Sequence, residues 1–153
     1  MKELLHSYWS ELYGETGKEK LDAFLGKLQV QTDQELETDW YRDAIVYALY
    51  VDLFNKDFNG LIDKLDYLHD LGATVLWLLP ILDSPMRDAG FDIKQYDRVR
   101  PELLGLTDDS SKEEQEEVFG KFLEEAHRRG IKVIFDIAIN HSSDQHPWFL
   151  EAK

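Results

Sequence analysis

Apolar residues at the start of the chain recur at helical spacing. Within residues 2–13, and again within residues 16–28, apolar side chains lie three or four positions apart, the spacing of one helical face. Gly14 separates the two stretches and predicts a break between two helices. Residues 31–39 are polar and indicate a linker. We therefore expect residues 1–38 to form a helical extension that precedes a separate domain.

Continuous apolar runs alternate with helical patterns in the rest of the chain. Residues 44–54, 73–79 and 132–141 form apolar runs of the kind found in parallel sheets, and we expect the last run to be buried on both faces. Helical patterns lie between these runs, at residues 61–71 and 111–129. The order strand, helix, strand, long loop, helix, strand predicts an α/β fold with parallel strands and right-handed crossovers.

Three parallel strands do not close a sheet, and no helical pattern follows the third strand. A parallel sheet needs cover on both faces and protected edges. We therefore expect residues 39–153 to be the opening portion of a larger β/α barrel. We also expect residues 1–153 alone to be poorly soluble, because the run from Val133 to Ile139 would lie on an uncovered edge.

Two polar residues interrupt the third apolar run. Asp136 and Asn140 are four positions apart, so both would point to the same face of a strand. Polar groups in such surroundings need hydrogen bonds or a function to offset their burial. His141 follows where the strand runs out into a loop, and ligands of α/β folds bind at this carboxyl-terminal edge. We expect the start of this strand to have a structural role and its end to belong to the active site.

A long polar loop follows the second strand and begins at the same edge of the sheet. Loops of this length without regular structure usually carry function. Asp88, Phe91 and Asp92 are its candidate residues. Aspartates also suit turns, and a phenylalanine is more typical of a core than of a ligand platform. We expect Asp92 to support the site.

Charge and composition narrow the class of ligand. The net charge is −14, from 31 acidic and 17 basic residues. Such a chain repels phosphate backbones and anionic lipids, so we expect neither a nucleic-acid nor a membrane partner. The first residues lack the apolar core of a signal peptide, and the chain has no cysteine. These features favour a cytoplasmic protein without disulfides or thiol chemistry.

Other kinds of site have less support. His141 and His146 are five positions apart with no cysteine to join them, a poor pattern for zinc. The sequence contains neither a Gly-x-Gly-x-x-Gly or Walker loop nor the Gly-x-Ser-x-Gly elbow of serine hydrolases. His141 taken alone is more typical of a hydrogen-bonded structural histidine than of a ligand-binding one.

Four segments match motifs of one enzyme family in the family's own order. Trp40–Tyr47 is similar to its first strand, and Leu65–Pro80 to its first helix and second strand. Asp136–His141 fits its first conserved region, Asp-x-x-x-Asn-His. This is the α-amylase family of glycoside hydrolases (family 13), and Asp144–Phe149 resembles a tail found in its trehalose synthases and oligosaccharide α-glucosidases. The resemblance implies that residues 39–153 are the first three β/α units of an incomplete (β/α)8 TIM barrel. Amylosucrase-like members of the family also carry helical N-terminal extensions.

The resemblance assigns roles to five residues. In the family, the residues that match Asp88 and His141 contact the sugar in the −1 subsite. The residue that matches Phe91 stacks on the face of the same sugar and is usually a tyrosine. The residue that matches Asp136 braces the barrel interior. The residue that matches Asn140 is a calcium ligand in many α-amylases and a structural amide in other members.

The resemblance implies no organic cofactor. The loop at residues 55–60 is shorter than the Asp-rich calcium loop of trehalose synthases, so we expect no metal there. Asn140 is the remaining candidate for a calcium ligand.

The family's catalytic carboxylates lie outside the predicted strands. Its nucleophile aspartate, acid–base glutamate and third aspartate follow the fourth, fifth and seventh strands of the barrel. Retaining glycoside chemistry needs two carboxylates about 5 Å apart, and we do not expect Asp88, Asp92 or Asp136 to take these roles. We expect the N-terminal part of a retaining enzyme that acts on α-glucans or α-glucosides, inactive as residues 1–153 alone.

Two alternatives stay open. One is a non-catalytic sugar-binding or regulatory relative that keeps the same barrel. The other is an unrelated β/α-barrel enzyme with a coincidental Asn-His at the end of a strand. The sequence fixes neither the linkage that is recognised nor the oligomeric state.

Overall fold

The computed structural model describes residues 2–27 and 39–153. Residues 2–27 and Trp40–Lys153 belong to two different compact units. Apart from Asp39, the linker predicted at residues 31–39 lies outside the described residues. Within the described ranges, no helix is long and apolar enough to cross a membrane.

The first unit is a helical pair. Helix α1 (Lys2–Lys27) is broken at Gly14, which has φ 66° and ψ −167°. A positive φ favours glycine, and the predicted break between two helices is confirmed. The two helical segments approach each other where His6 Nε2 lies 2.9 Å from Asp22 Oδ1.

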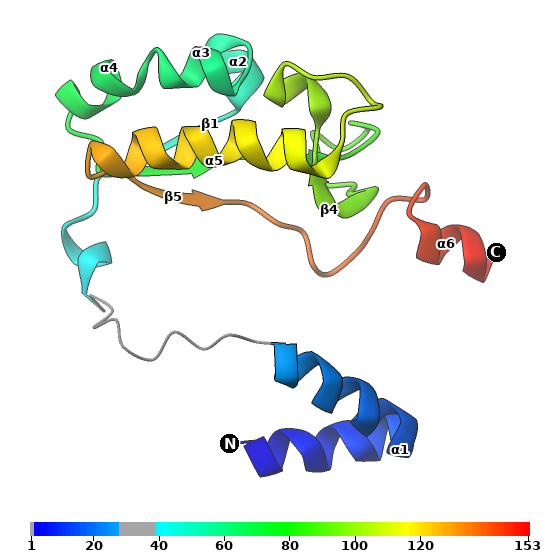
Figure 1. The fold of residues 1–153 in the computed structure, drawn as a ribbon. Coiled ribbons are helices and arrows are strands. Elements are labelled where there is room, and N and C mark those ends of the chain that lie inside the picture. Colours follow the sequence, from blue (N-terminus) through cyan, green and yellow to red (C-terminus); the bar gives the residue numbers. More distant parts are fainter. Residues whose placement is uncertain (1, 28–38) are drawn as a thin grey trace. The chain divides into compact units, whose positions relative to one another are not determined.

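The second unit contains a three-stranded parallel sheet (Figure 1). Its strands are β1 (Val46–Leu49), β2 (Val75–Leu78) and β5 (Lys132–Phe135), in the spatial order β1-β2-β5. Both neighbouring pairs are parallel and in continuous register. The predicted parallel α/β sheet is therefore confirmed.

Helical segments lie before, between and after the strands of this unit, so the expectation that no helix follows the third strand is wrong. The helices and helical turns are η1 (Trp40–Asp43), α2 (Val51–Asn55), α3 (Phe58–Ile62), α4 (Leu65–Asp70), η2 (Pro101–Leu104), α5 (Lys112–Arg128) and α6 (Pro147–Ala152). Ser111 caps α5 in a reciprocal capping box with Glu114, which satisfies backbone N–H groups that the first turn leaves free.

One face of the sheet carries the core. Because strand side chains alternate, Leu49, Leu76 and Leu78 share the face on which the helices pack. All three are buried, and they join one apolar cluster with Phe58 of α3 and Phe122 of α5. The rings of these two phenylalanines lie 4.9 Å apart.

The opposite face of the sheet is buried at Val75 and exposed further along the strands. Ala48, Trp77 and Ile134 lie side by side in register across β1, β2 and β5. Trp77 retains 40% of its accessible surface and Ile134 retains 38%. The prediction that the third strand is buried on both faces is therefore wrong for the described residues.

Two strands are shorter than their apolar runs. The first stops at Leu49, and Val51 begins helix α2 with Tyr50 as its N-cap. A short apolar run does not distinguish a strand from a buried helical turn. The third stops at Phe135, so the argument that strand alternation places Asp136 and Asn140 on one face does not apply.

The connection between β2 and α5 contains regular structure. Strand β3 (Leu82–Asp83) pairs antiparallel with β4 (Gln95–Val99) in a hairpin, and the Lys94 amide donates to the Asp83 carbonyl oxygen at 2.8 Å. The expectation of a long irregular loop is therefore wrong for its flanks. Neither a helix nor a strand is formed at the tip, residues 84–94, or in residues 105–111 before α5.

Candidate functional site

The tip of the β3–β4 hairpin is organised around the carboxylate of Asp92. Ser84 Oγ donates to Asp92 Oδ1 at 2.7 Å. The backbone amides of Arg87 and Asp88 donate to the same carboxylate at 3.1 and 3.3 Å. Ser84 Oγ also accepts from the Met86 amide at 2.9 Å. Asp92 thus holds the segment that carries Asp88, and its support of an active site stays a prediction.

The pKa of Asp92 reflects these contacts. Partial burial raises the pKa of its carboxyl group, but the hydrogen bonds from Ser84 and from the Arg87 and Asp88 amides outweigh that effect. The pKa therefore lies below its ordinary value, and Asp92 is ionised at neutral pH.

The hairpin tip has an unusual backbone. Met86, Ala89 and Gly90 all have positive φ, of 60°, 51° and 93°. A Cβ atom at position 90 would lie 2.8 Å from Pro80 Cβ, so glycine is required by both conformation and space. Left-handed residues other than glycine are uncommon and often accompany functional sites.

The hairpin tip presents its two candidate sugar contacts, Asp88 and Phe91, in different ways. Asp88 is exposed. Phe91 is half-buried and packs against the apolar core, and its amide donates to the Asp88 carbonyl oxygen at 2.9 Å. The Phe91 ring is therefore held in one orientation, while the Asp88 carboxylate, three residues earlier, is open to a ligand.

The segment after β5 carries the remaining candidates. The Asp136 amide donates to the Leu78 carbonyl oxygen at 2.8 Å and extends the sheet's hydrogen bonds by one residue. Asn140 and His141 are both exposed. His141 Nδ1 lies 3.1 Å from Asn140 Oδ1. If Nδ1 carries the proton it donates to this amide, which leaves Nε2 free to face a ligand.

Two contacts join the segment after β5 to the tip of the hairpin and to its end. The Ser143 amide donates to the Ile93 carbonyl oxygen at 2.9 Å. Arg87 Nη1 lies 2.8 Å from Asp144 Oδ2. Ser143 is two residues from His141, and Ile93 is two residues from Phe91. The two groups of candidates therefore lie on adjoining segments at one edge of the sheet.

Tyr96 on β4 belongs to this arrangement and was missed by the sequence analysis. Its hydroxyl lies 3.0 Å from the carbonyl oxygen of Ala138 and 2.7 Å from that of His141. The sequence offered no signal beyond one aromatic residue in a polar stretch, because the partners are backbone atoms more than forty positions away.

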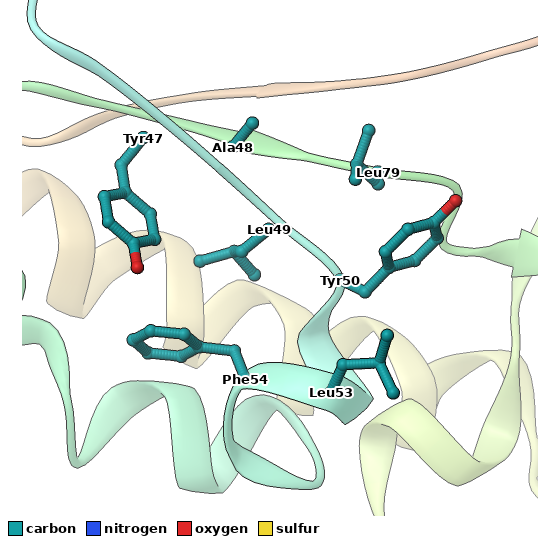
Figure 2. A pocket seen from close by; sticks show the side chains of 7 residues that line it. All are labelled: Tyr47, Ala48, Leu49, Tyr50, Leu53, Phe54 and Leu79. Atoms are coloured by element: carbon teal, nitrogen blue, oxygen red, sulfur yellow. The ribbon is translucent and has the colours of Figure 1, made fainter.

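A shallow pocket of about 270 Å³ lies at the carboxyl end of β1 (Figure 2). Its lining is apolar and aromatic, with the hydroxyls of two tyrosines as polar side-chain groups. It is lined by Tyr47, Ala48, Leu49, Tyr50, Leu53, Phe54 and Leu79. The rings of Tyr47 and Phe54 pack edge to face at 5.8 Å, which agrees with a packing role for Tyr47.

Residues 55–60, where no metal is expected, and Asn140, the predicted calcium ligand, both have partners within the protein. Asp57, between α2 and α3, caps α3 by accepting from the Gly60 amide at 2.8 Å. Among residues 2–27 and 39–153, no three acidic or histidine side chains are grouped so that they could hold a metal ion. The amide oxygen of Asn140 faces His141. Calcium binding by Asn140 stays a prediction, and no chemical step is derived from it.

Residues 29–153 match the family description "Alpha amylase, catalytic domain". The chain belongs to the α-amylase family. Among its relatives in this family, the oligo-1,6-glucosidase of Heyndrickxia coagulans is 37% identical over 123 residues, which are 76% of this chain and 20% of that protein. The trehalose synthase/amylase TreS of Mycolicibacterium smegmatis is 42% identical over 124 residues, 76% of this chain and 19% of that protein.

The fold of this chain is similar to that of a solved structure of the α-amylase family. The crystal structure of Bacillus licheniformis trehalose-6-phosphate hydrolase (TreA) has a TM-score of 0.61 and 39% identity, over 74% of this chain and 20% of that chain. This α-amylase family chain spans about one fifth of the length of the curated relatives it matches. The resemblance inferred from the sequence motifs is confirmed.

Proposed function

We propose that this chain is the N-terminal part of the catalytic (β/α)8 barrel of a retaining enzyme that acts on α-glucans or α-glucosides, and that it holds the first three β/α units. Asp88, Phe91 and His141 would form one wall of the −1 sugar subsite. Asp136 would brace the barrel interior, and Asn140 would orient His141.

The observation that carries the proposal is the junction between the two loops. The hydrogen bond from the Ser143 amide to the Ile93 carbonyl oxygen joins the segment of His141 to the segment of Phe91. Three residues of suitable chemistry thus share one edge: an exposed carboxylate for sugar hydroxyls, an aromatic ring for the apolar face of a pyranose, and an imidazole. Aromatic faces and directed hydrogen bonds are a common combination in small-ligand sites.

The bond-breaking step is assigned to groups outside this wall. Retaining hydrolysis or transfer needs one carboxylate to attack and another to protonate the leaving oxygen. We propose that later strands of the whole barrel supply both carboxylates, because this chain holds only the first three of the eight β/α units in the proposed barrel. Binding and orientation of the sugar are the tasks of the residues described here. This chemistry uses no cofactor, and a cytoplasmic location stays a prediction from composition.

The test uses the whole protein that includes this chain. Turnover of maltose, isomaltose, trehalose and sucrose is measured together with calorimetric binding of acarbose. We expect turnover of at least one substrate, and a loss of at least tenfold in kcat/KM in His141→Ala. His69→Ala, an exposed histidine on α4, is the matched control. Binding without turnover would indicate the non-catalytic relative, and absence of both would reject the proposal.

A further inference from the structure

Tyr96 ties its hydroxyl to the main chain of the segment that carries His141. The phenol oxygen lies 2.7 Å from the carbonyl oxygen of His141 and 3.0 Å from that of Ala138. A phenol has one proton to donate, so the two carbonyl groups share it. Strand β5 ends at Phe135, so these carbonyls lie beyond its part of the sheet. The Tyr96 hydroxyl supplies a partner that the strand does not.

The ring of Tyr96 is held independently of its hydroxyl. It packs against the rings of His146, at 5.4 Å, and Trp148, at 6.3 Å with 28° between the planes. His146 is only 6% exposed, and its Nδ1 accepts from the Trp148 amide at 3.1 Å, which caps α6. A ring fixed by such packing presents the hydroxyl in one orientation, so removal of the oxygen alone should leave the packing intact.

Tyr96 also shares a hairpin with the other two residues of the proposed sugar site. It lies on β4, directly after the tip that carries Asp88 and Phe91. Any shift of His141 relative to Phe91 must therefore stretch the contact at Tyr96 or the bond between Ser143 and Ile93. The hydroxyl acts closest to His141, because it bonds that residue's own carbonyl oxygen.

We propose that Tyr96 is a positioning residue of the sugar site, which acts through its hydroxyl on the main chain of residues 138–141 and so sets the place of the His141 imidazole relative to Asp88 and Phe91. The proposal rests on the proposed function of this edge as a −1 subsite. Displacement of a contacting group by about 1 Å can lower turnover on the order of a hundredfold. Loss of one of several restraints on His141 should have a smaller effect.

The test compares Tyr96→Phe with the unchanged whole protein. We expect kcat/KM to fall about tenfold, with the larger part of the change in kcat, because hydrogen bonds to the sugar strengthen in the transition state. We expect the melting temperature to stay within about 2 °C, since one exposed-edge hydrogen bond contributes little to global stability. Hydrogen exchange at the amides of residues 138–143, followed by mass spectrometry, should become faster. Tyr67→Phe, which removes an exposed hydroxyl on α4, is the matched control. It should change neither kcat/KM nor the exchange of these amides.

The outcomes separate the two proposals. Slower turnover together with faster exchange supports a positioning role. Unchanged turnover, or slower turnover with unchanged exchange, overturns it. An unmodified protein that neither binds nor converts α-glucosides overturns the proposed function instead, and in that case the exchange measurement alone still accepts or rejects the restraint that Tyr96 places on the main chain.

Discussion

The guanidinium of Arg87 lies 2.8 Å from the carboxylate of Asp144, 57 positions further along the chain. Both side chains are more than half exposed. Exposed ion pairs contribute only ~0–1 kcal/mol to stability. The importance of this pair is therefore geometric, because it joins the hairpin tip to the segment that follows His141.

Removal of this ion pair should affect sugar binding more than folding. In Arg87→Gln of the whole protein, we expect KM for an α-glucoside to rise several-fold while the melting temperature stays nearly unchanged. The double variant Arg87→Asp/Asp144→Arg should recover most of the lost affinity, and 0.5 M salt should weaken the unchanged pair through screening, roughly as the Debye length predicts. Steady-state kinetics at low and high salt measure these effects. A KM in the single variant equal to that of the unchanged protein would contradict this prediction.

The low pKa of Asp92 predicts a pH dependence of the hairpin's stability. A carboxyl group whose pKa is lowered by folding stabilises the fold at pH values above its unfolded pKa, and this contribution is lost as the pH falls through the lower folded value. Asp92→Asn should therefore be less stable than the unchanged protein at neutral pH. The difference should disappear as the pH falls below the ordinary value of 3.8.

Thermal unfolding of both proteins between pH 2 and pH 7 measures this difference. Asp109→Asn, at an exposed turn, serves as the control and should show no such convergence. A difference for Asp92→Asn that is constant across the whole range would contradict the proposed role of its charge.

Two glycine substitutions should have opposite effects. Gly90→Ala combines a positive φ with a Cβ atom 2.8 Å from Pro80, so we expect a loss of more than ~1 kcal/mol. Gly120 lies inside α5, where an added Cβ would meet no atom within 4 Å. Gly120→Ala should stabilise the helix by roughly 0.5–1 kcal/mol. Urea unfolding of the whole protein measures both, and stabilisation by Gly90→Ala would show that the tip can relax.

The exposed sheet face predicts the behaviour of residues 1–153 in isolation. Trp77 and Ile134 form an apolar patch beside the strand edge of β5, a feature that promotes association. We expect this segment to aggregate, and Ile134→Lys to raise the monomeric fraction in size-exclusion chromatography. Leu71→Lys changes an exposed leucine outside the sheet and is the control. Monodisperse, cooperatively melting protein without substitution would contradict the prediction.

Local signals in the sequence predicted much of the second unit. Helix α5 was located by its apolar spacing, and it begins after Ser111, because a serine and a glutamate three positions apart satisfy each other's backbone. The parallel direction of the strands followed from the alternation of strands and helices, since parallel strands need crossover connections. These features depend on residues that are close together in the chain.

The features that were missed depend on distant partners. Strand β5 stops at Phe135 because strand β2, its partner, stops at Leu78, and an apolar run cannot report where its neighbour ends. The β3–β4 hairpin escaped notice because β3 has only two residues and β4 is largely polar. The sequence motifs identified Asp88, Phe91 and His141. The backbone hydrogen bonds that bring their segments together could not be predicted, because such bonds do not depend on residue type.

The hairpin between β2 and α5 has a consequence for protein engineering. Residues 82–99 fold back on themselves, and the segment from Ala138 to Asp144 is bonded to them through Ile93, Tyr96 and Arg87. Exchange of either segment alone between α-amylase family members would separate segments that are bonded to each other. Chimeras that transplant both segments as one block should retain activity, whereas those with a crossover point between them should express poorly or lose substrate preference.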